Sequence, residues 1–549
     1  MKMLTLLEVG NLGGVVVMII GIIIVVALVV SLVVTLIAKV IYEWNNDKKI
    51  YQKTVLADDA YFFVDLWTDQ RFYLWRNVKI KIMPVRNYTY YDYTISLCPE
   101  CLKRVGAKII IEDEAVFMTK RCPDHGFFKT MIASDVQYYK NIRNYNKASE
   151  MPVHFGTDVE YGCPYDCGLC VDHEQHSCLS IVEVTDRCNL TCPTCYAMSS
   201  PHYGSHRTLE QIEAMFDTIV KNEGEPDVVQ ISGGEPTIHP EFFKIMDIAK
   251  SKPIKHLMLN TNGIRIANDP GFAEKLATYA PEFEIYLQFD SFKPEVLEDF
   301  RGKDLTSVRM KALEKLNELN LSTTLVIVLQ KGKNIDEIGK LIDFALKQKC
   351  VRGITFQPVE VAGRNREDSA HEKITLTEVR QEILNQFPLL NGDDIIPVPC
   401  NPDALAMGYI LKLEGETIPL TRYINPADLL NNETKNTIVY EQDAGLQMQL
   451  LDIFSTGISV DKVQPKVNQL LCCLPEVSAP NLDYDNLFRI IIMNFMDAHD
   501  FDVRAIKKSC VHIVNKDLKM IPFETMNLFY RDDKIKYLEE LRKEDKVLF

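Results

Sequence analysis

The stretch SIVEVTDRCNLTCPTCYA, residues 180–197, joins a short apolar run to three closely spaced cysteines. Cys188, Cys192 and Cys195 have the spacing C-x3-C-x2-C. Three thiolates at this spacing can hold three corners of a [4Fe–4S] cluster, whereas a structural cluster normally takes four. A zinc site is the alternative, although structural zinc also takes four protein ligands. The triplet therefore predicts a cluster with one open iron, at which a substrate or cofactor can bind.

Residues 181–365 alternate apolar runs with helical stretches. The runs are SIVEVT, DVVQIS, HLMLNTN, EIYLQFD, TTLVIVL and GITFQPV, and the helical stretch TLEQIEAMFDTIV has Thr208 as its predicted N-cap. Strand–helix alternation is typical of βα units and a parallel sheet. Six such units predict an α/β fold with a partial (β/α)6 barrel rather than a closed eight-stranded one. Ligands of such sheets bind at the carboxyl ends of the strands.

Polar motifs stand at three of these predicted strand ends. They are SGGEPT (232–237), NTNG (260–263) and LQFDS (287–291). A glycine turn after a strand is common by itself, and a polar strand end can simply cap the next helix. The position of SGGEPT after the cysteine triplet favours a functional role for it.

Together, the triplet and these strand ends resemble the radical S-adenosylmethionine superfamily. The resemblance implies that the amino and carboxylate groups of S-adenosylmethionine chelate the open iron. One electron, from a low-potential donor such as ferredoxin or flavodoxin, then cleaves the cofactor to a 5′-deoxyadenosyl radical that abstracts hydrogen. It implies cofactor contacts from Gly233, Gly234, Glu235, Asn260, Asn262, Gln288 and Asp290, and adenine packing near GITFQPV (353–359). Thr194 departs from the aromatic residue that many members carry there, and Tyr196 is the candidate to replace it.

The segment 151–180 carries a second cysteine set immediately upstream. Cys163, Cys167, Cys170 and Cys178 form C-x3-C-x2-C-x7-C, which is complete for an auxiliary [4Fe–4S] cluster. A zinc knuckle is the alternative. His173 and His176 lie in the same loop and could replace a cysteine, support the ligands or lie in solvent.

A third set lies in the segment 96–150. Cys98, Cys101, Cys122 and His125 form C-x2-C…C-x2-H, which predicts a small structural domain folded around zinc or a rubredoxin-like iron.

Residues 366–549 have a mixed pattern and predict an α+β C-terminal region. A further cluster there would draw on Cys400, Cys472, Cys473 and Cys510. Scattered cysteines can instead be buried small apolar residues, and this is our prediction for Cys350.

The order of these motifs across most of residues 95–530 resembles the tetraether lipid synthase type, once grouped with the class D radical methylases. That resemblance implies carbon–carbon bond formation or methyl transfer at an unactivated C–H bond, on a lipid alkyl chain. Two departures weaken it, namely NPDALA after Cys400 and Glu524 at a position often held by cysteine. The alternatives are a radical methylase or modifier of a soluble small molecule or peptide, and a non-enzymatic iron–sulfur electron carrier.

The N-terminus supports the lipid hypothesis. Residues 9–38 carry no charge. The length of this run exceeds the roughly 20 apolar residues needed to cross a bilayer and the 7–15 apolar residues of a signal peptide. We therefore expect a single-pass membrane anchor in residues 1–49, with its span at about 12–38, followed by a β-rich segment at 50–95. Only Lys2 precedes the span, whereas four lysines follow it, namely Lys39, Lys48, Lys49 and Lys53. The catalytic body is therefore expected to face the cytoplasm. In that reducing compartment, cysteines act as thiolate ligands rather than as disulfides. The bilayer and a lipid are the expected partners.

The whole chain has 549 residues, of which 47% are hydrophobic and 25% charged, as in ordinary globular proteins. Its net charge of -15 argues against nucleic-acid binding, because phosphate-backbone affinity needs a basic surface.

Overall fold

The computed structural model describes residues 86–145, 147, 150–365, 373–413, 416–422, 486–531 and 534–546. Residues from Tyr90 onward form one compact unit. The predicted membrane span, most of the segment 50–95, and both Cys472 and Cys473 lie outside the described residues. Within the part of the chain that is described, none of the helices has the length and apolar character needed to span a membrane.

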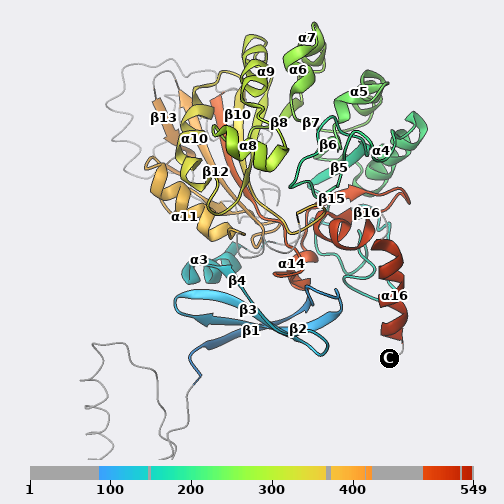
Figure 1. Cartoon of the computed structure of the whole chain (residues 1–549), viewed down its shortest axis with the longest axis vertical. Helices are drawn as coiled ribbons and strands as arrows, with labels where there is room; N and C mark the ends of the chain where they lie inside the picture. The colour runs from blue at the N-terminus through green and yellow to red at the C-terminus, as the bar shows by residue number, and fades with distance from the viewer. Residues whose placement is uncertain are drawn as a thin grey trace, which may run out of the picture. The chain divides into compact units, whose positions relative to one another are not determined.

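The six predicted strands form a parallel sheet in chain order. They are β5 (Leu179–Thr185), β6 (Val228–Gly233), β7 (His256–Thr261), β8 (Phe283–Gln288), β9 (Thr323–Leu329) and β10 (Val351–Pro358). Between them run α4 (Leu209–Glu223), α5 (Phe242–Lys250), α6 (Ile264–Asn268), α7 (Phe272–Ala277), α8 (Pro294–Arg301), α9 (Thr306–Glu318) and α10 (Ile338–Lys347) (Figure 1). Thr208 caps α4 in a capping box with Gln211. The prediction of an α/β core is confirmed.

The C-terminal region extends this same sheet at both edges. β14 (Leu487–Met493) pairs in parallel with β10, and β15 (Val511–Val514) pairs in parallel with β5. Further strands add antiparallel pairs: β12 (Leu405–Leu413) beside β14, with β11 (Ile396–Pro397) and β13 (Glu416–Pro419), and β16 (Met520–Pro522) beside β15. The strand path in the described residues ends at β11 and β16 and does not close. The sequence prediction of an open barrel is confirmed, but it did not include the two outer parallel strands. The reason is that β14 and β15 do not follow the regular alternation of strand and helix in the sequence.

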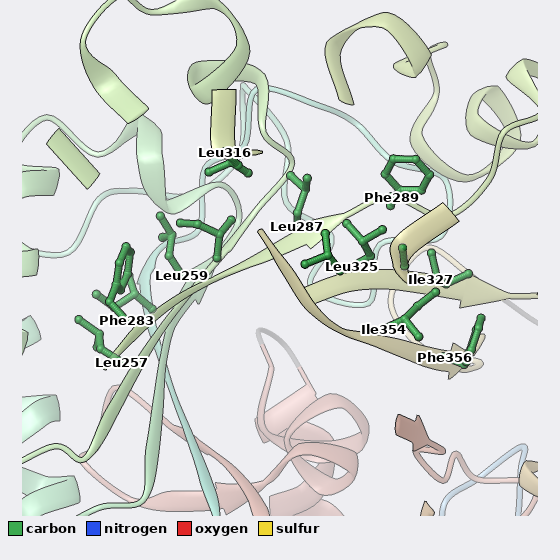
Figure 2. Packing of buried hydrophobic residues seen from close by; sticks show 14 of the residues in the cluster. Leu257, Leu259, Phe283, Leu287, Phe289, Leu316, Leu325, Ile327, Ile354 and Phe356 are labelled. Atoms are coloured by element: carbon green, nitrogen blue, oxygen red, sulfur yellow. The ribbon is translucent and has the colours of Figure 1, made fainter. Parts of the chain in front are cut away.

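The described residues of the C-terminal region include the helices α11 (Leu376–Gln386), η5 (Leu420–Arg422), α14 (Val503–Ile506), α15 (Phe523–Thr525), the π-helix η9 (Met526–Tyr530) and α16 (Lys534–Lys546). Buried apolar side chains pack the sheet against its helices. Figure 2 shows this layer, in which Leu257, Phe283, Leu325 and Ile354 come from four neighbouring strands and Leu316 comes from α9. Both faces of a parallel sheet are covered, which explains why these strands read as continuous apolar runs.

A separate four-stranded antiparallel sheet precedes the core, with strand order β1-β2-β3-β4. Its strands are β1 (Thr89–Leu97), β2 (Arg104–Glu112), β3 (Ala115–Cys122) and β4 (Gly126–Ala133), followed by α3 (Val136–Asn141). A buried lysine joins it to the C-terminal region, since Lys120 Nζ donates to the carbonyl of Ala498 over 2.6 Å and to Ser96 Oγ over 3.0 Å.

Candidate functional site

The cysteine triplet lies in the loop that follows β5 and lines a pocket at the carboxyl ends of the parallel strands. Cys188 and Cys192 are each only 8% exposed. Burial raises the pKa of the Cys188 thiol to about 12. Such a thiol becomes a thiolate at neutral pH only beside positive charge, which a bound iron ion supplies. The donor set therefore fits a [4Fe–4S] cluster held by three cysteines.

Two arginines that the sequence analysis did not single out hold this loop in place. Arg364 donates from Nε to the carbonyl of Cys192 over 2.7 Å and from Nη2 to the carbonyl of Ser199 over 2.8 Å. Arg301 lines the pocket and hydrogen-bonds to Cys192. A lone arginine in a loop or at a helix end carries no pattern, so nothing in the sequence signalled either role.

Gly233 and Gly234 line the pocket because the end of β6 presses against the cysteine loop. A Cβ at Gly234 would lie 2.0 Å from the carbonyl oxygen of Arg187, and Gly233 has a φ of +122°. Two backbone hydrogen bonds tie the segments together, from Gly234 to Thr185 over 2.8 Å and from Glu235 to Arg187 over 2.9 Å. The glycines thus permit a close approach of backbone to backbone as well as to a ligand.

Glu235 lies behind the glycines and is 1% exposed. Its carboxylate accepts hydrogen bonds from Thr261 Oγ1 (2.7 Å), the Asn262 amide (2.9 Å) and the Thr237 amide (3.2 Å). Burial raises its pKa. The side chain joins the ends of β6 and β7, and the cofactor contact that the resemblance implies for it stays a prediction.

Asn260, Asn262 and Gln288 line the pocket as a polar wall. Gln288 donates to Asn260 over 3.4 Å, and Asn262 donates to Asn189 of the cysteine loop over 2.7 Å. Gln357 and Val359, from the predicted adenine-proximal strand, line the same pocket. Polar donors and acceptors are thereby placed within reach of a ligand beside the triplet.

Asp290 is fully buried and does not line the pocket. Its carboxylate accepts two hydrogen bonds from Arg301, both over 2.8 Å, and one from Arg309 over 2.7 Å. Although burial raises its pKa, the two guanidinium groups hold it below its usual range. Asp290 therefore positions Arg301 at the pocket wall, while the direct cofactor contact that the resemblance implies for it stays a prediction.

The second cysteine set is divided between two places. Cys163, Cys167 and Cys170 share the loop before β5, where a hydrogen bond from Cys167 lowers the pKa of Cys163. Cys178 instead lies with Cys400 and Cys510, and these three sulfur atoms are all within 4.8 Å of one another. The cause is the pairing of β5 with β15, because Leu179 and Val511 are register partners and the cysteines directly precede them. The structure therefore places Cys178 in a group that its sequence spacing does not indicate, and these three thiols fit an auxiliary metal site.

The two histidines of that loop are buried. His176 lies 3.6 Å from the Cys178 sulfur and 3.1 Å from Glu223, and His173 Nε2 lies 2.8 Å from the carbonyl oxygen of Ser509. Neither is a solvated surface residue, and His176 is positioned to support the Cys178 thiolate. Cys350 is completely buried in the core, as predicted.

The Cys3His residues converge at one end of the four-stranded sheet. His125 Nδ1 lies 3.6 Å from the Cys98 sulfur and 3.5 Å from the Cys122 sulfur, and the sulfur atoms of Cys101 and Cys122 are 3.8 Å apart. Separations of this size match the edges of a tetrahedral metal site. The donor set fits the predicted zinc or mononuclear iron.

Comparison with known proteins finds matches for the parallel-sheet core and for the four-stranded sheet that precedes it. The model of the radical SAM superfamily matches residues 182–345, and that of the HMPTM N-terminal zinc ribbon domain matches residues 90–134. The 7,8-dihydro-6-hydroxymethylpterin dimethyltransferase of Methanocaldococcus jannaschii is 31% identical over 80% of this chain and 94% of its own length. The subtilosin biosynthesis protein AlbA of Bacillus subtilis is 23% identical over 59% of this chain and 68% of its own.

Among solved structures, SuiB of Streptococcus suis bound to S-adenosylmethionine aligns with a TM-score of 0.32 and 16% identity, over 38% of this chain and 46% of that chain. Proteins of the superfamily use a [4Fe–4S] cluster, S-adenosylmethionine and an external reductant, and the three pocket cysteines fit that cluster. From the match to the Methanocaldococcus jannaschii protein and to the superfamily model, the chain belongs to the radical S-adenosylmethionine superfamily, in the same family as that dimethyltransferase.

Proposed function

We propose that this chain is a radical enzyme that methylates or otherwise modifies a soluble heterocyclic compound of the pterin class at an unactivated carbon. The observation that carries the proposal is the 31% identity to a pterin dimethyltransferase over 94% of that relative's length. The pocket supports it, because its polar wall and its apolar wall together suit a flat ligand with hydrogen-bonding edges.

The residues that line the pocket have different roles. Cys188, Cys192 and Cys195 would hold the cluster, which when bound supplies the electron that cleaves S-adenosylmethionine. Arg301 lines the pocket close to Cys192, and the ion pair with Asp290 holds its guanidinium group in place there. Ile181 and Val511 exclude water from the interior of the sheet, which protects a radical from quenching.

A second candidate substrate is a lipid alkyl chain, as the tetraether lipid synthase resemblance implies. It is favoured by the charge-free residues 9–38, and we propose with it a single-pass anchor and a cytoplasmic body. An anchor would raise the enzyme's effective concentration near lipid chains. The apolar side chains Met493, Phe495 and Phe523 on one wall of the pocket suit such a chain.

The test is anaerobic turnover of the reconstituted full chain with dithionite and S-adenosylmethionine. One reaction contains 7,8-dihydro-6-hydroxymethylpterin, and a parallel one contains chain-deuterated glycerolipid in detergent micelles. We expect 5′-deoxyadenosine and a pterin product heavier by one or two methylene units. Deuterium in the 5′-deoxyadenosine of the lipid reaction, with the pterin unchanged, would refute the pterin proposal in favour of the lipid candidate.

Matched cysteine variants show whether the triplet is responsible. Cys192→Ala should abolish 5′-deoxyadenosine formation, because one of three cluster ligands is lost. Cys350→Ala removes an equally buried thiol that lies in the core, away from the pocket, and should retain it. Equal activity in both variants would contradict the assignment of the cluster.

A further inference from the structure

Glu360 is a buried carboxyl group in the wall of the reactive pocket, just beyond the end of β10. It is 9% exposed. Among the described residues that line the pocket it is the one carboxylate, and Arg301, which is neutralised by Asp290, is the one arginine or lysine. A carboxyl group in such a place is costly unless a partner satisfies it.

The hydrogen bonds of the Glu360 carboxylate leave part of its acceptor capacity unused. Asn527 of η9 donates from Nδ2 to the two carboxylate oxygens over 3.1 and 3.4 Å. The orientation of that amide is defined, because its Oδ1 accepts from Arg531 Nε over 2.7 Å, and Arg531 is itself paired with Glu183. A carboxylate offers about four lone-pair positions, of which the amide group uses at most two.

The neighbouring walls are aromatic. Phe495 and Phe523 stack with ring centroids 4.0 Å apart, and Tyr196 meets Phe523 edge-on at 4.9 Å. These rings and Glu360 line the same pocket as the three cysteines. A ligand that lies against the rings would thus extend from an acidic anchor toward the cysteine loop.

We propose that Glu360 anchors the substrate by accepting a hydrogen bond from its O–H or N–H group, while the aromatic side chains hold its apolar part. This inference rests on the proposed function of the pocket. The ligand that this site would recognise has a hydroxyl or amine donor joined to an apolar body. The edge of an aminopyrimidine ring offers such a donor, and so does a glycerol hydroxyl of a lipid. Burial and the nearby Asp497 raise the pKa of Glu360 to about 8, against the opposing effect of Lys373, and a hydrogen-bond donor from the substrate would favour the ionised form of the group.

The test compares Glu360→Gln and Glu360→Ala with wild type. In Glu360→Gln the amide oxygen pairs with Asn527, so the NH2 group faces the pocket and presents a donor where the substrate needs an acceptor. Glu337→Gln is the control, because Glu337 is a buried carboxylate that binds the Phe292 amide and does not line the pocket. Binding is measured with 7,8-dihydro-6-hydroxymethylpterin and with detergent micelles containing a dialkylglycerol.

We expect both Glu360 variants to bind one of the probes about 10- to 100-fold more weakly, the range expected for losing a hydrogen bond to a charged group. Iron content should stay within about twofold of wild type, since no cluster ligand changes. The affected probe identifies the source of the donor. Wild-type binding without turnover would refute the proposed reaction and leave the anchor supported.

Three results would overturn the inference. The first is that the Glu360 variants bind both probes as tightly as wild type. The second is that they lose iron in parallel with binding, which would make the role structural. The third is that wild-type protein binds neither probe.

Discussion

Replacing Gly234 with alanine tests whether the contact between β6 and the cysteine loop positions the reactive site. Gly234 does not have a positive φ, so alanine is compatible with its backbone and the only obstacle is space. The added Cβ would lie 2.0 Å from the carbonyl oxygen and 2.5 Å from the carbonyl carbon of Arg187. Arg187 directly precedes Cys188, so any relief of this contact moves the first cluster ligand.

The size of the displacement follows from these distances. Real Cβ atoms essentially never approach closer than 3.0 Å, so the two backbones must separate by about 1 Å or more from the present 2.0 Å. That separation strains the hydrogen bonds from Gly234 to Thr185 and from Glu235 to Arg187. We expect a loss of about 1–3 kcal/mol in the free energy of unfolding. A misplacement of about 1 Å can lower a reaction rate about 100-fold.

The assay measures iron per chain, the EPR signal of the reduced cluster with and without S-adenosylmethionine, and the rate of 5′-deoxyadenosine formation. Gly392→Ala is the control, since its Cβ would meet only the end of the Arg380 side chain at 3.1 Å. We expect a slow, iron-poor Gly234→Ala protein and a nearly unchanged control. Full iron content and a wild-type rate in Gly234→Ala would refute the reasoning that this contact positions the cysteine loop.

Three further perturbations have defined outcomes. Cys122→Ser should remove the ribbon metal and lower the Tm, because metal binding and folding are coupled in such domains; an unchanged metal content per chain would contradict the Cys3His assignment. Asp290→Asn keeps a residue type that tolerates the local φ of +62° but leaves Arg301 without its buried partner. It should cost about 3–5 kcal/mol in urea unfolding, and a loss below about 1 kcal/mol would show that the pair is dispensable. Burial opposes the ionisation of Glu284, but Arg489 holds its pKa well below the usual range. The contribution of ionised Glu284 to the free energy of unfolding is therefore complete above the unfolded-state pKa of about 4.3 and is lost as the pH falls below that value. Glu284→Gln should accordingly flatten the acid limb of the curve of unfolding free energy against pH.

Much of the reactive centre could be predicted from the sequence because its determinants are local. The triplet, the six apolar runs and the SGGEPT motif lie within segments whose spacing reflects strand, loop and turn geometry directly. The Cys3His set is equally local, since two short turns supply all four ligands. Less can be predicted where a polar residue has two possible partners. Glu235 and Asp290 accept hydrogen bonds from protein groups that the sequence does not place beside them.

The α/β core, the three-cysteine loop and the metal ribbon can all be predicted from the sequence, because each depends on residues close together in the chain. The grouping of Cys178 with Cys400 and Cys510 becomes visible in the folded chain alone, since it follows from the pairing of β5 with a strand more than 300 residues later. The tertiary structure also decided the positions of Arg301 and Glu360 in the pocket wall. The reason is that no sequence period records which loops meet at the carboxyl edge of a sheet, whereas the burial and charge of the site depend on that meeting.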